Sequence, residues 1–264
     1  MDSFIISQLF FYPIKSLGGI EVSESMVLPK GLQYDRRWML IDENNRFLTQ
    51  RNYPEMAMIK TSFDQDSILI HYMDITLVLP YQSKGDCLVA DVWEDNVNVQ
   101  EVDETLSKWF SHVLKMSCKL VAFPEVNTRW VDPDYAIHSN NQTSLSDGYP
   151  ILIIGQSSLD DLNRRLESPV SIDRFRPNIV FTGGTPYEED EWNIFNIGDV
   201  KMVGVKPCAR CVMTTIDQQT GEQGKEPLAT LSSYRKNGNK VLFGLNVIPL
   251  KTGLISVGEK IVVL

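Results

Sequence analysis

The sequence lacks the motifs on which several common chemistries depend. It has three histidines and no HExxH pair that could hold zinc. It contains no GxSxG serine elbow and no GxGxxG dinucleotide loop. Gly224-Lys225 is similar to the end of a phosphate loop, but Glu226 stands where the Ser or Thr that binds magnesium would be. These absences count against a zinc protease, a serine hydrolase, a Rossmann enzyme and a P-loop NTPase.

Long apolar runs and dense cysteine are also missing. No segment approaches the roughly 20 consecutive apolar residues that a membrane helix needs. Met1–Phe11 is apolar in places, but Asp2 stands where a signal peptide would carry a basic residue, so we interpret this segment as a first strand. Four cysteines in 264 residues are too few for a typical secreted disulfide framework. We therefore expect a cytoplasmic protein with reduced thiols and no membrane partner.

The chain is acidic, with a formal net charge of -9. An acidic protein is a poor general binder of nucleic acid, so we expect no nucleic-acid partner. Any anion that this protein holds must lie in a local basic pocket. The positions of its arginines therefore matter more than their number.

Short apolar segments separated by turn signals predict a protein that is mainly β with some α (α+β), and their spacing suggests a β-barrel. The predicted strands are 4–10, 20–28, 37–42, 67–72, 75–79, 179–181, 200–205, 212–216, 241–248 and 261–264.

Two amphipathic segments, 103–115 and 157–167, predict helices from their apolar spacing. A loop-like stretch at 124–148 follows the first helix. We therefore predict an N-terminal β-rich domain over residues 1–122 and a β-barrel domain over 123–264.

Several other side chains are assigned no chemistry. Trp93, Trp109 and Trp192 are expected in the core, because large aromatic side chains bury the most apolar area. The acidic run Glu188–Glu191 is expected to form a solvated face.

The sharpest chemical signal is the CxxC pair Cys208 and Cys211, which is accompanied by Lys206 and Arg210. A structural zinc site would need a second close pair of ligands, which this sequence lacks. A thioredoxin-like redox pair opens a helix, whereas Val212–Ile216 favours a strand. A pair of core cysteines is a third alternative, but an apolar core disfavours the two neighbouring cations. These cations would instead favour a thiolate, which is both a soft metal ligand and a nucleophile.

The residues around this pair resemble the signature of MOSC-domain proteins. The signature matches Cys208–Asp217, Thr220-Gly221 and Lys225–Leu228. Further matches to the family, including its MOSC N-terminal β-barrel domain, occur in family order at Tyr12–Ser16, Asp35–Trp38, Leu48–Arg51 and Phe175–Val180. Within the family, the chain is similar to the mitochondrial amidoxime-reducing component and its bacterial counterparts. Several separate motifs that occur in the family's order make the resemblance specific, whereas a CxxC motif alone would not.

This resemblance implies that the chain binds the molybdenum cofactor (Mo-molybdopterin) and that Cys211 is both the metal ligand and the catalytic residue. The first cysteine, Cys208, is not invariably a ligand in the family. Cofactor-binding roles are implied for Lys15, Ser16, Arg36, Asp147, Gly148, Arg176, Asn178 and Arg210. Gln50 and Arg51 are candidates for the mouth of the substrate site.

These residue types suit the cofactor. Guanidinium groups bind phosphate in a bidentate way, glycine loops offer backbone N–H groups, and the amide of Asn178 can both donate to and accept from a pterin edge. Each also has a plainer interpretation. Lys15 and Arg36 could be surface charges, Arg36 could pair with an acidic neighbour, Asn178 could cap a turn, and Asp147-Gly148 could be only a turn.

The resemblance favours an oxidoreductase that reduces a small N-hydroxylated substrate. No cysteine follows Cys211, so an iron–sulfur cluster on this chain is not expected. Electrons would come from a separate ferredoxin- or flavin-type reductase. Three alternatives stay open: a sulfur carrier with a persulfide on Cys211, a non-catalytic carrier of the cofactor, and a domain that binds no cofactor. Pyridoxal phosphate binding is a further family term, to which no residue is assigned.

Overall fold

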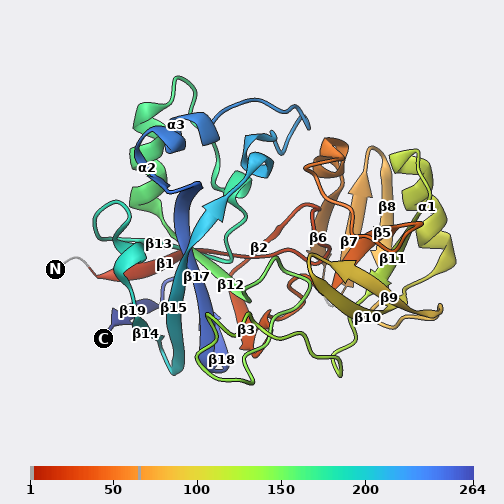
Figure 1. The fold of residues 1–264 in the computed structure, drawn as a ribbon, viewed down its shortest axis with the longest axis horizontal. Coiled ribbons are helices and arrows are strands. Elements are labelled where there is room, and N and C mark those ends of the chain that lie inside the picture. Colours follow the sequence, from red (N-terminus) through yellow and green to blue (C-terminus); the bar gives the residue numbers. More distant parts are fainter. Residues whose placement is uncertain (1–2, 65–66) are drawn as a thin grey trace.

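Strands dominate the computed structural model, which describes residues 3–64 and 67–264. In these residues there are three α-helices: α1 (Glu104–Leu114), α2 (Gln156–Arg165) and α3 (Leu228–Tyr234). Figure 1 shows α2 and α3 together at one side of the molecule and α1 at the other. The predicted class, mainly β with some α, is confirmed. No helix in the described ranges has both the length and the apolar character to span a bilayer.

The largest sheet closes into a barrel. Its strands are β1 (Phe4–Phe11), β2 (Ile20–Val22), β12 (Ile151–Gly155), β13 (Ile179–Thr182), β14 (Ile194–Ile197), β15 (Val200–Arg210), β16 (Lys236–Asn237), β17 (Lys240–Lys251) and β19 (Lys260–Val263). Because β17 pairs with both β15 and β12, the order β12-β13-β1-β19-β14-β15-β17 returns to its start. Closure leaves the seven strands of this path without open edges, and the predicted barrel is confirmed.

Three smaller sheets complete the strand structure. One contains β5 (Trp38–Asp42), β11 (Cys118–Ala122), β10 (Asp95–Glu101) and β9 (Cys87–Val92). A second contains β6 (Lys60–Asp64), β7 (Ser67–Tyr72) and β8 (Ile75–Leu79). The third contains β18 (Gly253–Ser256), β3 (Glu24–Leu28) and β4 (Gly31–Leu32). Four short 3-10 helices lie among the described residues: η1 (Pro54–Met58), η2 (Ile172–Phe175), η3 (Glu188–Glu191) and η4 (Val212–Thr215).

Two of the first strands, β1 and β3, pair with strands from the C-terminal half of the chain. Strand β1 pairs with β13 and β19, and β3 pairs with β18. Residues 123–150, between β11 and β12, contain no helix or strand, which agrees with the predicted loop-like stretch. The division into domains 1–122 and 123–264 stays a prediction.

Helix α1 forms where the apolar spacing predicts it. The carboxylate of Asp103 caps its first turn by accepting bonds from the backbone N–H groups of Thr105 and Leu106. Leu106 and Phe110 are buried on its inner face. The segment Val212–Ile216, predicted as a strand, is instead the 3-10 helix η4 and its C-cap, so that prediction is wrong.

The turn at η4 has a local cause. The hydroxyl of Thr214 donates to the carbonyl of Cys211 at 3.0 Å, and that of Thr215 donates to the carbonyl of Val212 at 2.8 Å. Such side-chain bonds to nearby backbone compete with a strand ladder. The β-propensity of Val and Thr is too dependent on context to override them.

Two other expectations fail. The run Glu188–Glu191 is not simply solvated, because Glu189 is fully buried and its carboxylate accepts bonds from the Gly155 N–H at 3.0 Å and the Ser158 hydroxyl at 2.8 Å. Trp192 lies in the core as expected, and Trp109 packs against it half-buried. Trp93, by contrast, is exposed at the turn between β9 and β10.

Candidate functional site

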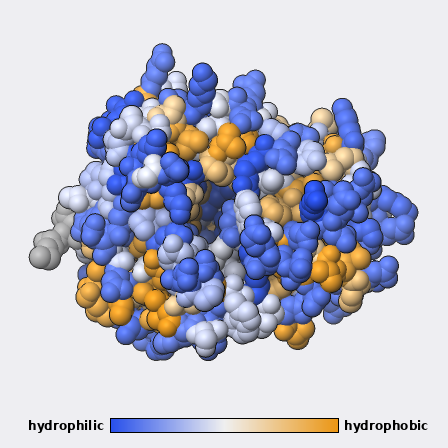
Figure 2. Space-filling view, viewed as in Figure 1, coloured by the Kyte–Doolittle hydropathy of each residue, from blue (hydrophilic) through white to orange (hydrophobic). Residues whose placement is uncertain are grey.

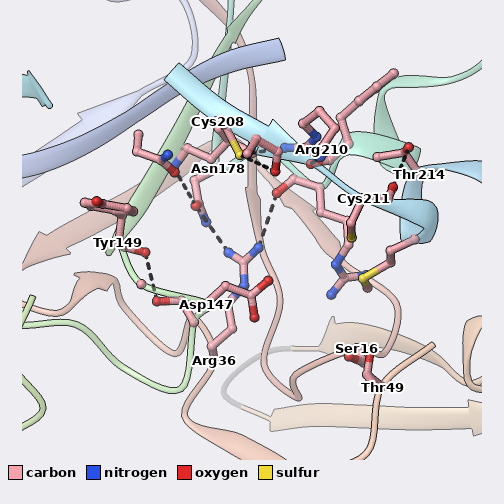
Figure 3. A pocket seen from close by; sticks show the side chains of 18 of the residues that line it. Ser16, Arg36, Thr49, Asp147, Tyr149, Asn178, Cys208, Arg210, Cys211 and Thr214 are labelled. Atoms are coloured by element: carbon pink, nitrogen blue, oxygen red, sulfur yellow. Dashed lines mark hydrogen bonds between the residues drawn. The ribbon is translucent and has the colours of Figure 1, made fainter. Parts of the chain in front are cut away.

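A cavity of about 290 Å³ opens between the barrel and the loops beside it. Figure 2 shows the face of the molecule hollowed near its centre. Several stretches of chain contribute to the walls, including the loop after β1, residues 49–51, the loop before β12, the segment from η2 to β13, the end of β15, η4 and β17. Figure 3 shows that Arg36, Asp147, Asn178 and Cys211, which are far apart in the sequence, face a common space.

The cavity is strongly cationic, although the protein as a whole carries a charge of -9. Eight lysines and arginines line it, and Asp147 is the one carboxylate among its described lining residues. The cations are Lys15, Arg36, Arg51, Arg174, Arg176, Lys206, Arg210 and Lys240. The cavity is therefore the local basic pocket that any anion on this acidic protein would require.

Arg176 is the clearest unmet donor in this pocket. It follows η2 in a left-handed conformation, with a φ of 55°, and it is only 8% exposed. Its guanidinium lies 4.2 Å from the ring centroid of Tyr12, and Nη1 donates to the carbonyl of Leu17 at 2.7 Å. Nη2 is buried without a partner among the described residues. Burial lowers the pKa of Arg176 to about 10, so the group keeps its charge at neutral pH.

Arg36 has a different environment, because its charge is balanced within the fold. Its Nη1 lies 2.7 Å from a carboxylate oxygen of Asp35, which is fully buried. The same nitrogen donates to Oδ1 of Asn178 at 3.2 Å. The structure therefore shows Arg36 paired with an acidic neighbour, which is one of the plainer interpretations of this residue.

The amide of Asn178 is likewise engaged by the protein. Its Oδ1 also accepts from the backbone N–H of Leu152 at 3.1 Å, and its Nδ2 donates to the carbonyl of Phe10 at 3.2 Å. The side chain is 1% exposed. Asn178 therefore ties β1, β12 and Arg36 together, and little of its amide is left to face a ligand.

Lys15 and Asp147 form a pair at the cavity wall. The Lys15 ammonium donates to Asp147 at 2.5 Å and to the carbonyl of Leu145 at 2.8 Å. Burial lowers the pKa of Lys15, and the neighbouring carboxylate opposes this. Partial desolvation opposes ionisation of Asp147, whose side chain is still 66% exposed, but Lys15, Arg51 and the Trp93 N–H outweigh it and lower the pKa of the carboxyl group. The carboxylate is therefore ionised at neutral pH.

Ser16 and Gly148 line the cavity beside this pair. Ser16 has a left-handed backbone with a φ of 67°. A Cβ atom at Gly148 would meet nothing within 4 Å, so packing alone does not require glycine there.

Both cysteines of the CxxC pair line the cavity, and neither is in a disulfide. Cys211 directly follows β15 and is exposed, whereas Cys208 is half-buried. The Arg210 guanidinium lies 3.0 Å from Sγ of Cys208, so it contacts the first cysteine of the pair. It also donates to the carbonyl of Phe175 at 2.5 Å, and its Nε is buried with no partner in the described part of the chain.

The side chains around the cavity suit a metal that has few protein ligands better than a metal held by several. In the part of the chain that the structure describes, no group of three or more His, Cys, Asp or Glu side chains is placed to hold a metal ion. A metal in this cavity would therefore need ligands beyond the thiols of Cys208 and Cys211, such as those of an anionic cofactor. The unpaired N–H of Arg176 and the surplus of cations suit such a group.

The two residues predicted to lie at the mouth of the substrate site have different positions in the structure. Arg51 lines the cavity, with its guanidinium 4.3 Å from the ring centroid of Trp93. Gln50 is fully buried, where its Nε2 donates to the Ser16 carbonyl at 2.8 Å and its amide pairs with that of Gln218. The prediction that Gln50 lies at the mouth of the site therefore does not match its position.

Sequence reasoning did not assign Thr49, Arg174 or Lys240 to the site, although all three line the cavity. It also misplaced Trp93, whose Nε1 donates to Asp147 at 3.2 Å. The signal for Trp93 was its place between two strands, because a hairpin turn rarely carries a large aromatic residue without another reason.

Comparison with known proteins identifies the family. The MOSC N-terminal beta barrel domain matches residues 3–117, and the MOSC domain matches residues 140–262. Mitochondrial amidoxime-reducing component 1 of Mus musculus is 35% identical, with 98% of this chain and 82% of that protein covered. The chain belongs to the MOSC-domain family.

Two further relatives are similar to this MOSC-domain chain over different shares of their own length. Mitochondrial amidoxime-reducing component 1 of Homo sapiens is 32% identical over 98% of this chain and 82% of its own length. The molybdenum cofactor sulfurase of Oryza sativa subsp. japonica is 30% identical over 91% of this chain, but over only 32% of its own length. The resemblance inferred from the motifs is confirmed.

Proposed function

We propose that this MOSC-domain protein binds the molybdenum cofactor and reduces N-hydroxylated compounds with electrons from a separate partner. The observation that carries the proposal is the position of Cys211, an exposed thiol in a cavity with eight cations and one carboxylate. Relatives that match most of their own length are named as amidoxime-reducing components, which supports a reductive reaction on an N–O bond.

The residues divide into two groups in this proposal. Arg176, Arg210 and Lys206 would hold the anionic parts of the cofactor, because their charges are not balanced by a carboxylate in the described structure. Cys211 would provide the thiolate that binds the metal. When bound, the cofactor supplies a metal that exchanges two electrons and accepts an oxygen atom.

The protein's own groups limit where protons come from. Asp147 is ionised at neutral pH because its pKa is lowered, so it is not a proton donor there. Lys15 is held by Asp147 and the Leu145 carbonyl, so its ammonium orients the loop before β12. Because Cys211 is exposed, protons can reach the site from bulk water.

The electron donor would be a separate ferredoxin- or flavin-type reductase. Arg51 and Lys240 line the cavity without a carboxylate partner among the described residues, and they would attract an acidic donor surface. A cytoplasmic location stays a prediction.

The proposal is tested by molybdenum per chain, measured by elemental mass spectrometry after expression in a host that makes the cofactor. We expect near-stoichiometric metal in the wild type, loss of the metal in Cys211→Ser, and retention in the matched control Cys208→Ser. Reduction of benzamidoxime with a chemically reduced viologen dye should follow the same order.

Three other results would redirect the proposal. Metal that stays bound without turnover, given a competent donor, would favour a cofactor carrier. A persulfide trapped on Cys211 without metal would favour sulfur transfer. Metal absent from a folded wild type, without persulfide, would leave the domain without a cofactor.

A further inference from the structure

A second hollow of about 670 Å³ adjoins the cationic cavity. The two share a wall made of Asp147, Gly148, Tyr149 and Lys206. The far side of the hollow is formed by the turn between β9 and β10 and by residues 128–133 of the long loop before β12. A molecule in this hollow would therefore lie against the same residues that border the Cys211 cavity.

Two tryptophans line the hollow and remain open to solvent. Trp93 is 45% exposed and Trp130 is 52% exposed. Exposing two of the largest apolar side chains within one concavity is unfavourable in water, and a flat ring placed against them would recover that free energy.

Trp93 is held in place at a conformational cost. Its φ is 58°, in the left-handed region that a bulky residue rarely adopts, and Asn or Gly is preferred in such a hairpin turn. Its Nε1 donates to Asp147, and its ring faces the Arg51 guanidinium at 4.3 Å. Backbone strain of this kind is concentrated at binding sites. The turn thus presents Trp93 at the border of the two cavities.

The charge of the hollow is opposite to that of the cavity beside it. Four carboxylates line it, against two cations. Asp95 is paired with Arg129 at 2.7 Å, and Asp147 is paired with Lys15 at 2.5 Å. Glu94 and Asp132 have no ion-pair partner among the described residues. The second cation, Lys206, is turned toward the ring of Tyr135 at 3.6 Å.

We infer that this hollow binds the non-reacting part of the substrate, and that it selects an aromatic ring carrying a positive charge. The ring would lie against Trp93 and Trp130, and the positive charge would lie near Glu94 and Asp132. The reacting group would point across the Asp147–Tyr149 wall toward Cys211. This inference rests on the proposed function for the identity of the substrate, but the recognition site itself does not depend on turnover.

The test is direct binding of three probes to the full-length protein by titration calorimetry. Benzamidine is an aromatic cation, acetamidine is a cation without a ring, and benzoate is an aromatic anion that should prefer the cationic cavity. We expect benzamidine to bind more tightly than acetamidine and to bind more weakly as salt is added. Trp130→Leu should weaken benzamidine binding about fivefold, and Trp130→Phe should restore most of it.

Further variants separate the parts of the site. Trp93→Leu should also weaken benzamidine binding, and Glu94→Gln combined with Asp132→Asn should reduce the preference for benzamidine over the uncharged benzyl alcohol. Met73→Ala, at an 84% exposed position on the turn between β7 and β8, is the surface control and should change nothing.

Two results would overturn the inference. One is benzamidine binding no tighter than acetamidine. The other is benzamidine binding that is unchanged in a folded Trp130→Leu protein. Because neither measurement involves molybdenum or reduction, failure here is distinct from failure of the proposed function. Absence of metal with intact benzamidine binding would reject only the latter.

Discussion

The unmet donor on Arg176 leads to a prediction that can be tested without the cofactor. Its Nη2 is buried and has no partner within residues 3–64 and 67–264, whereas Nη1 is bonded to the Leu17 carbonyl. A charge-assisted hydrogen bond to an anion is worth about 1.5–3 kcal/mol. Inorganic phosphate, used as the simplest probe of the pocket, should therefore bind about 10- to 100-fold more weakly to Arg176→Met than to the wild type.

Thermal unfolding converts this difference into a melting shift. Phosphate at ten times its Kd should stabilise the wild type by about 1.4 kcal/mol. For a chain of this size, that raises the Tm by about 3–6 °C. In Arg176→Met the same phosphate concentration should add at most about 0.4 kcal/mol, or roughly 1 °C.

The variant itself should be nearly as stable as the wild type without phosphate. It loses the bond to the Leu17 carbonyl, but it also removes a buried charge that no carboxylate in the described structure neutralises. Arg164→Met, which removes one positive charge from an exposed position on α2, controls for the change in net charge. If phosphate raised the Tm of Arg176→Met as much as that of the wild type, the assignment of Arg176 as an anion donor in the pocket would be refuted.

Two further predictions concern carboxylates. Burial raises the pKa of Glu189 above its ordinary value of 4.5, so stability from its neutral form is lost as pH rises through the raised value. Glu189→Gln should accordingly gain stability over the wild type at pH 8 but not at pH 4, as measured by urea midpoints; an equal difference at both pH values would contradict this. Asp147→Asn removes the carboxylate of the cavity. Repulsion between a carboxylate and an anion a few ångströms away costs about 1 kcal/mol, so the phosphate affinity measured by calorimetry should rise about fivefold in this variant. Weaker phosphate binding in that variant would show that the carboxylate supports the pocket instead of opposing its charge.

Local signals in the sequence were sufficient for much of the fold. Helix α1 was predictable because its apolar spacing and its Asp103 cap act within a few residues of each other. The class and the barrel followed from short apolar segments between turn signals. At Val212–Ile216 the β-propensity was misleading, because side-chain hydrogen bonds to the nearby backbone compete with a strand there.

The family motifs selected residues that line one cavity, but they did not indicate the hydrogen-bond partners of those residues. Of the residues that the resemblance selected, the structure brings Lys15, Arg176 and Cys211 to one cavity and leaves Gln50 outside its described lining. The sequence could not indicate that Asn178 and Arg36 are largely engaged by the protein itself, because their partners lie far away along the chain.

The sequence by itself determined the fold class, the positions of α1 and α2, the family that the chain resembles, and that any bound anion needs a local basic pocket. Only the tertiary structure decided which cations share that pocket, that Glu189 is buried, and that Trp93 is exposed. The physical reason is the range of the interactions. Propensity, capping and apolar period act over a few residues, whereas charge balance and burial depend on contacts such as Lys15 with Asp147, 132 positions apart. Such contacts exist only in the folded chain.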